Sequence, residues 1–270
     1  MKKILVVILI LTSITSCSQN IDALVTEISD ANIVEHEHVG IGGLKGQNYL
    51  RFQELSKKAN THQLLQLITH KNPVVVCYAS WALIEQEYEN LPEIFKSLLK
   101  DERTIKTMSG CLMRSDSISS EFYHRYWNLV HAKKAKDETL SELDKIILTS
   151  ENPSRFLLSS ALENRVYDDN YKKTIYTLGF QKNYLEAIFY LCNWHRAEYN
   201  DELQGFIVNE LKTTEFKGKN SSVYYKLLEE LIKFNNKDVH DFIVDKYRSD
   251  KPNINEIENF VSLLERNYIF

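Results

Sequence analysis

The sequence predicts an all-α protein made of roughly a dozen short antiparallel helices. Glycine and proline, which mark turns, are scarce at eight and four residues, and four of the glycines fall within residues 40–46. A β-sandwich of this length would need many more turn residues. Apolar residues instead recur at the i, i+3, i+4 and i+7 spacing of an amphipathic helix, and short polar breaks separate these periods.

The helical spacing is repeated along the chain in periods short enough to pack as antiparallel neighbours. The breaks between periods include residues 71–73, 151–153 and 217–220. The apolar positions that follow the spacing are Val75, Tyr78, Ala79, Ala82 and Leu83; Leu91, Ile94, Phe95, Leu98 and Leu99; Leu203, Phe206, Ile207 and Leu211; Tyr224, Leu227, Leu228, Leu231 and Ile232; Val239, Phe242, Ile243 and Tyr247; and Ile257, Phe260, Val261 and Leu264.

The amino terminus has the pattern of a secretory signal peptide over residues 1–16. Lys2 and Lys3 provide a positive start, residues 4–11 are uninterruptedly apolar, and residues 12–16 are small and mostly polar. The apolar run is too short to span a bilayer as a helix. The sequence therefore predicts export from the cytoplasm.

The end of this segment, Ile14-Thr15-Ser16-Cys17, resembles the lipobox of bacterial lipoproteins. The resemblance implies a diacylglyceryl group on the Cys17 thiol, cleavage after Ser16, and acylation of the new amino terminus, for example with palmitate. It places the protein in the cell envelope, at the outer membrane of a diderm cell, with which Ser18 is compatible, or otherwise at the outer face of the cytoplasmic membrane. The alternative is an ordinary signal peptide that contains a cysteine.

The charge balance argues against two kinds of partner. The chain has 33 basic and 37 acidic residues and no basic block. We therefore expect neither nucleic-acid binding nor electrostatic adsorption to anionic lipid. Membrane association is expected from the acyl chains alone, and more than one chain makes such an anchor stable.

Three cysteines follow the lipobox, namely Cys77, Cys111 and Cys192. An odd number cannot pair completely within one chain. Each lies among apolar residues at helical spacing, which predicts small buried core residues. One disulfide with a leftover thiol is the alternative.

An internal repeat supports a helical array. Residues 67–73 align with residues 147–153 at an offset of 80 residues, and each copy ends an apolar helix, turns at Asn-Pro and opens a second helix. Proline suits that place because its missing N–H costs nothing in the first helical turn. The offset equals two units of about 40 residues, the length of a two-helix solenoid repeat. An intermediate copy is predicted to start at residue 98, with Ile105 and Lys106 opening its second helix.

Residues 61–83 resemble a HEAT repeat, within a clearest unit of 61–87. Val76 stands where HEAT repeats usually carry an arginine. The resemblance implies a HEAT/armadillo-like α-α superhelix over residues 49–270. The match to the repeat is partial to about residue 165, and beyond it only the helical periodicity continues. Residues 17–48 are predicted as a tether and irregular segment. In this match the first helix contains Leu64, Leu65, Leu67 and Ile68. The turn is Asn72-Pro73, and the second helix contains Val75, Ala79, Ala82 and Leu83.

Two patterns within the tether invite a chemical interpretation and do not meet its requirements. The glycine loop 40–46 lacks the Gly-Lys-Ser/Thr of a phosphate-binding loop, since Gly46 follows Lys45. Glu35-His36-Glu37-His38 lacks the i, i+4 histidines of a zinc helix, and its histidines share a face only if the segment is extended. We predict a flexible linker and a solvated polar segment, without a metal.

Aromatic and basic side chains at the end of an apolar helix form the predicted partner-binding site, which consists of Trp194, His195 and Arg196. A similar mixture occurs at residues 124–127. For both segments the alternative to recognition is packing of the tryptophan between helices, with its polar neighbours pointing outward. Tyrosines are concentrated between residues 167 and 199. They either line a concave surface or pack half-buried between helices.

Together these patterns predict a membrane-anchored lipoprotein that acts as a protein-interaction scaffold, with an envelope or periplasmic protein as its partner. We predict no catalytic residue, no cofactor and no metal. One alternative is a helical-barrel envelope hydrolase acting on glycan or peptide, which needs two converging carboxylates or a nucleophile beside a base. The other is an inhibitor or immunity-type binding protein.

Overall fold

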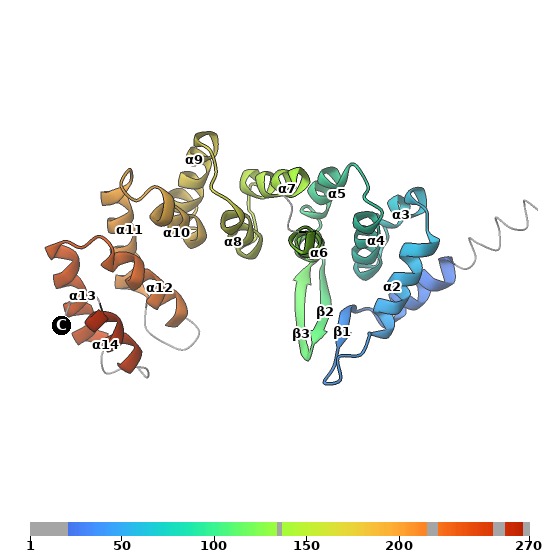
Figure 1. Ribbon diagram of the computed structural model, residues 1–270, viewed down its shortest axis with the longest axis horizontal. Helices are drawn as coiled ribbons and strands as arrows, with labels where there is room; N and C mark the ends of the chain where they lie inside the picture. The colour runs from blue at the N-terminus through green and yellow to red at the C-terminus, as the bar shows by residue number, and fades with distance from the viewer. Residues whose placement is uncertain (1–20, 134–136, 215–220, 251–256, 267–270) are drawn as a thin grey trace, which may run out of the picture. The chain divides into compact units, whose positions relative to one another are not determined.

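The computed structural model describes residues 21–133, 137–214, 221–250 and 257–266. These residues are mostly helical, and a small three-stranded sheet accompanies the helices (Figure 1). The chain divides into two compact units, residues 1–150 and residues 151–270. None of the described helices combines the length and the apolar character needed to cross a bilayer. The predicted signal peptide and Cys17 lie outside the described residues.

The first unit combines helices with the sheet. After a helix over residues 21–31, its elements are β1 (Val34–Val39), α2 (Gln47–Lys58), α3 (Thr61–Leu67), α4 (Pro73–Glu85), α5 (Leu91–Leu98), β2 (Thr104–Gly110), β3 (Leu112–Ser117), α6 (Ile118–Lys133) and α7 (Glu138–Thr149). Helix α4 contacts α2, α3, α5 and α6, and also β1 and β2. It is therefore the central element of this unit.

Helix α4 is apolar around its whole circumference. Every residue from Val74 to Ile84 is buried, which is the property of a helix surrounded on all sides. The ring centroid of Trp81 lies 5.5 Å from those of both Phe52 and Tyr78. Burying an apolar side chain of this kind contributes about 1.5–3 kcal/mol, so these rings are a main source of the unit's stability.

Tyr78 also joins the sheet to this helix. Its hydroxyl accepts a hydrogen bond from the Glu35 N–H at 2.8 Å and donates one to the Glu35 carbonyl at 3.1 Å. Burial raises the pKa of Tyr78 well above its usual range. The neutral phenol thus satisfies both backbone groups of a strand residue.

The helical hairpin expected around Asn72-Pro73 is present. Helix α3 ends at Leu67 and α4 begins at Pro73. The side-chain oxygen of Asn72 accepts from the N–H groups of Val74 and Val75, and proline fits the first helical turn because it has no N–H to satisfy. The small residues of α4, Ala79 and Ala82, are fully buried, as a close approach of helices requires.

The sheet corrects the all-α prediction. Strand β2 pairs in parallel with β1 and antiparallel with β3. Strand β1 lies in the region expected as an irregular tether, and Ile105, expected to open a helix, lies in β2. Ile105 and Thr107 are buried while Lys106 between them is exposed, the period-two pattern of a half-buried strand. Gly110, with φ of 53°, makes the turn into β3.

The segment Glu35-His36-Glu37-His38 is extended as part of β1. The His36 ring lies edge-on to Trp81 with centroids 5.3 Å apart, and its Nε2 is 3.1 Å from Glu121 Oε2. His38 Nδ1 lies 3.0 Å from the carbonyl oxygen of Gly43. Both histidines therefore contact groups of their own unit, and across the described ranges no cluster of three or more His, Cys, Asp or Glu residues is placed to hold a metal.

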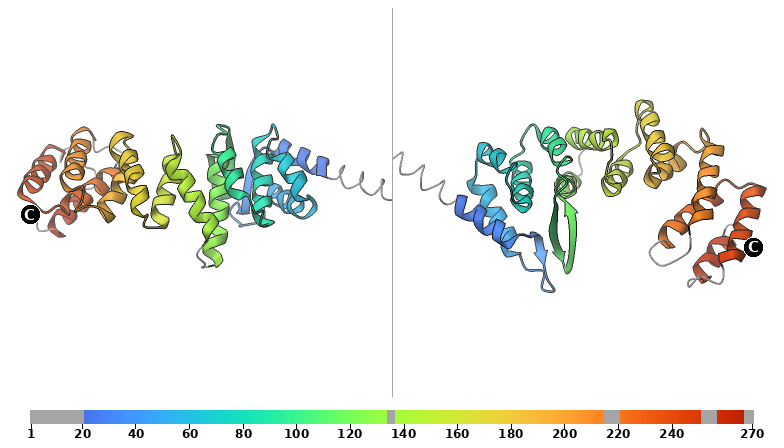
Figure 2. Two further views of the ribbon diagram at one scale, coloured as in Figure 1. Left: turned by 90° about the horizontal axis from the view of Figure 1, so that it is seen from above. Right: turned by 180° about the vertical axis from the view of Figure 1, so that it is seen from behind.

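The β2–β3 hairpin extends beyond the helices of its unit, as the view from behind shows (Figure 2). Its turn lies beside the loop that follows β1, because the Gly40 N–H donates to the Gly110 carbonyl at 2.8 Å. The loop after β1 exposes the large apolar side chains of Ile41 and Leu44, and the start of β3 exposes those of Leu112 and Met113.

The described secondary-structure elements of the second unit are all helical. Its elements are α8 (Arg155–Asn164), α9 (Asp169–Tyr176), the π-helical turn η1 (Thr177–Gln181), α10 (Leu185–Trp194), α11 (Asn200–Thr213), α12 (Ser221–Ile232), α13 (Lys237–Asp250) and α14 (Ile257–Arg266). Helix α10 contacts α8, α9, η1 and α11. At Gly179 in η1 an added Cβ would lie 2.9 Å from Ile188 Cδ1, so a larger residue there would require the Ile188 side chain to shift.

The tyrosines between residues 167 and 199 pack between helices, in agreement with the second alternative. Two of their hydroxyl groups bind backbone carbonyls: Tyr167 donates to Ala161 at 2.7 Å, and Tyr184 donates to Pro153 at 3.0 Å. The buried members are Tyr167 and Tyr190, and the half-buried members are Tyr171, Tyr176, Tyr184 and Tyr199.

Candidate functional site

The predicted partner-binding segment lies at the end of α10, and its three residues have different environments. Trp194 closes the helix and is 56% exposed. His195 caps the helix and its ring centroid lies 6.0 Å from that of Tyr190. Only Trp194 therefore presents a large free surface, which is unusual for an indole in a folded protein.

Arg196 is bound within its own unit. Its Nε donates to the Cys192 carbonyl at 3.1 Å, and one terminal nitrogen donates to the Glu230 carbonyl at 3.2 Å. The other lies 2.5 Å from Glu230 Oε2, and the guanidinium stands over the Phe234 ring at 5.0 Å. These contacts tie the end of α10 to α12, and the role of Arg196 as a partner contact stays a prediction.

His195 is likewise turned toward its own unit. Its side chain is 16% exposed, and its Nδ1 lies 3.6 Å from Glu198 Oε2. The hydrogen bond from Lys172 lowers the pKa of Glu198, which keeps this carboxylate charged beside the imidazole. His195 thus belongs to a small polar network at the helix end.

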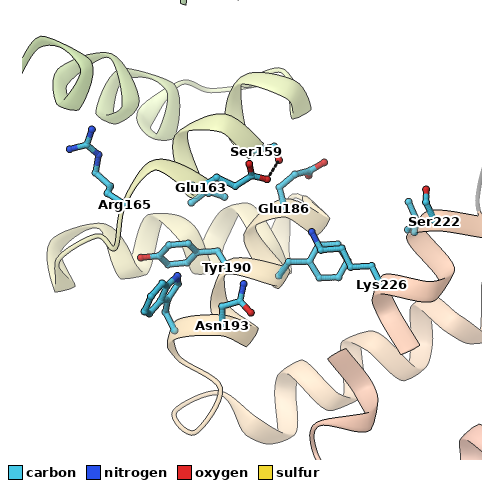
Figure 3. A pocket seen from close by; sticks show the side chains of 12 residues that line it. Ser159, Glu163, Arg165, Glu186, Tyr190, Asn193, Ser222 and Lys226 are labelled. Carbon is cyan, nitrogen blue, oxygen red and sulfur yellow. Dashed lines mark hydrogen bonds between the residues drawn. The ribbon is translucent and has the colours of Figure 1, made fainter. Parts of the chain in front are cut away.

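Trp194 lines a pocket of about 470 Å³ formed by α8, α10 and α12 (Figure 3). Within each of these helices, residues three and four positions apart share one face and therefore line the pocket together. Helix α10 contributes Glu186, Phe189, Tyr190, Asn193 and Trp194; α8 contributes Ser159, Leu162 and Glu163; and α12 contributes Ser222, Val223 and Lys226.

The pocket joins aromatic surface to charged groups of both signs. Ser159 Oγ donates to Glu163 Oε1 at 3.0 Å, and the Lys226 ammonium lies 4.4 Å from the centroid of the Phe189 ring. The Tyr190 hydroxyl accepts from a backbone N–H at 2.8 Å. These contacts hold the walls in place without using Trp194.

One carboxylate oxygen at this pocket has no hydrogen-bond partner. The Oε2 atom of Glu186 is buried and has no hydrogen-bond partner, a state that costs free energy unless a donor is supplied. Asn193 is exposed at the rim. Sequence reasoning found Trp194 but missed Glu186 and Asn193, although their spacing of seven residues on one helix was a usable signal.

The other mixed cluster, residues 124–127, packs within the first unit. The Arg125 guanidinium lies 5.1 Å from the centroid of the Trp81 ring and pairs with Glu85. Trp127 is half-buried. These contacts support the packing alternative for this segment.

The cysteines divide into two kinds. Cys77 and Cys192 are buried, as expected, and Cys111 is exposed in the turn between β2 and β3. All three are free thiols, so the prediction of burial is wrong for Cys111. Its apolar neighbours belong to an exposed hairpin turn, which helical spacing did not reveal.

Comparison of the chain with protein-family models, with curated proteins and with solved structures gave no match.

Proposed function

We propose that this protein is a binding module of the cell envelope, held at a membrane by lipid on Cys17. In this proposal the helical hairpins form a HEAT-like superhelix that carries the module, and the partner belongs to the envelope. The exposure of Trp194 and the unsatisfied Glu186, both on α10 and in the lining of one pocket, carry the proposal. An exposed aromatic side chain and an unpaired buried acceptor are both unfavourable in the free protein, and a ligand relieves both.

The pocket lining combines aromatic side chains with a larger number of polar and charged ones. In ligand sites, aromatic side chains supply contact area and polar groups fix the orientation of the ligand. Tryptophan is also among the residues that contribute most to binding when a partner covers them. Trp194, Phe189 and Glu186 supply these elements on a single helix.

A retention experiment tests the proposal. The mature protein, immobilised through an added carboxyl-terminal tag, is exposed to solubilised envelope fractions from the source cells, and retained protein and glycan are quantified separately. We expect specific retention that falls with Trp194→Ala and not with Phe156→Ala. Phe156 is a matched control because it is 44% exposed on α8 and does not line the pocket. Equal retention by both variants would contradict the proposal.

A further inference from the structure

The charges around the pocket oppose a charged ligand. Glu163 and Glu186 contribute carboxylates, and Arg165 and Lys226 contribute cations. An anion or a cation entering this space meets repulsion as well as attraction, so neither gains much from the walls. A neutral molecule avoids that conflict.

The unsatisfied Glu186 oxygen and the exposed Asn193 amide together favour a ligand that both donates and accepts hydrogen bonds. Glu186 Oε2 is an acceptor without a donor. The amide of Asn193 offers both a donor and an acceptor at the rim. An ammonium only donates, and a fully ionised phosphate only accepts, whereas a hydroxyl group does both. Neighbouring hydroxyls on one ring therefore match this set best.

The exposed indole of Trp194 adds a flat apolar surface. One face of a pyranose ring is lined by C–H groups, and such a face packs on an aromatic ring while the hydroxyls at the ring edge remain free for hydrogen bonds. The pocket volume of about 470 Å³ lies within the range of small-ligand sites and accommodates one or two sugar rings.

We infer that the pocket between α8, α10 and α12 binds a neutral saccharide, a unit of one or two pyranose rings from an envelope glycan. One ring stacks on Trp194, a hydroxyl accepts from the Asn193 amide, and a hydroxyl of the second ring donates to the carboxylate of Glu186, about two helical turns away on α10. This inference rests on the proposed binding function and names its ligand class.

Isothermal titration calorimetry on the full mature chain tests the ligand class. The sugar probes are N,N′-diacetylchitobiose, cellobiose and maltose, and the other probes are tetramethylammonium, inorganic phosphate and trialanine. We expect saturable binding of at least one disaccharide. Trp194→Ala should weaken it at least about tenfold, the equivalent of about 1.4 kcal/mol, and Glu186→Gln should weaken it to a smaller extent. Phe156→Ala is the matched control, and thermal unfolding shows that each variant is folded.

The outcomes separate this inference from the proposed function. Binding of no disaccharide, or disaccharide binding that Trp194→Ala leaves unchanged, overturns the saccharide assignment. If trialanine binds instead and Trp194→Ala abolishes that binding, the binding function stands and its ligand is a peptide. If no probe binds and envelope retention is also insensitive to Trp194→Ala, both the inference and the proposed function are wrong.

Discussion

Arg196 illustrates how one side chain can serve structure where its residue type indicates recognition. Its guanidinium compensates Glu230, which is only 6% exposed. Removing one partner of a buried ion pair leaves an uncompensated charge, which destabilises more than the pair itself stabilises. Loss of binding in an Arg196 variant therefore cannot be assigned to a lost partner contact.

We expect Arg196→Ala to lower the free energy of unfolding by about 1–3 kcal/mol. The value is limited because Lys233 Nζ also lies 2.6 Å from Glu230 Oε1. The midpoint of urea unfolding measures the change, and Arg155→Ala, at an exposed arginine on α8, is the control. Equal midpoints for the two variants would show that the Glu230 contact adds nothing to stability.

The three described thiols should differ sharply in reactivity. Cys111 is exposed, whereas burial raises the pKa of Cys192 to about 12 and that of Cys77 well above its usual range. The thiolate is the reactive form, so at pH 8 a thiol-specific chromophore should label Cys111 in the native protein and the other two only after denaturant. A Cys17→Ser background removes the amino-terminal thiol. Labelling of Cys192 at the native rate of Cys111 would contradict the structure.

At the scale of elements, the α3–α4 hairpin makes a test of helix packing. Ala79 is fully buried in α4, and Ala79→Leu adds volume where the packed neighbours have no room. We expect a loss of about 1–3 kcal/mol. Ala23→Leu, at an exposed position of the helix over residues 21–31, should be near neutral because leucine is a good helix former. Denaturant midpoints compare the two, and an unchanged midpoint for Ala79→Leu would mean that this face of α4 is not closely packed.

Local signals explain which elements could be predicted from the sequence. The Asn72-Pro73 turn and the two helices around it depend on residues a few positions apart, and they were predicted correctly. The pairing of β1 with β2 was missed because it is not local: Val34 pairs with Thr107. The β2–β3 hairpin is local, and it was missed because Ile105 and Lys106 were assigned to a helix. Likewise, Trp194 stood out as a residue type, while its pocket needs side chains from three helices that no sequence spacing relates.

At the scale of the whole molecule, the proposed lipid anchor can be tested independently of the fold. Cys17→Ser removes the thiol that receives the diacylglyceryl group, so we expect an unprocessed, unacylated protein. Mass spectrometry of the amino-terminal peptide from membranes measures this, with the wild-type peptide as the reference. An unmodified Cys17 in wild-type membranes would exclude the anchor.

Only Ser18, Gln19 and Asn20 separate Cys17 from the helix over residues 21–31, so an anchor there would hold the first unit close to the lipid surface.

The complete burial of α4 has a consequence for how this chain can vary. A helix with one exposed face tolerates polar substitutions every three or four positions. The helical period of 3.6 residues therefore appears in the pattern of tolerated substitutions. Helix α4 has no exposed position from Val74 to Ile84. In a saturation mutagenesis library selected for folded protein, polar residues should be depleted at every position of this stretch. Sequence change in the first unit is therefore expected to accumulate around α4 and to leave an uninterrupted apolar run at its centre.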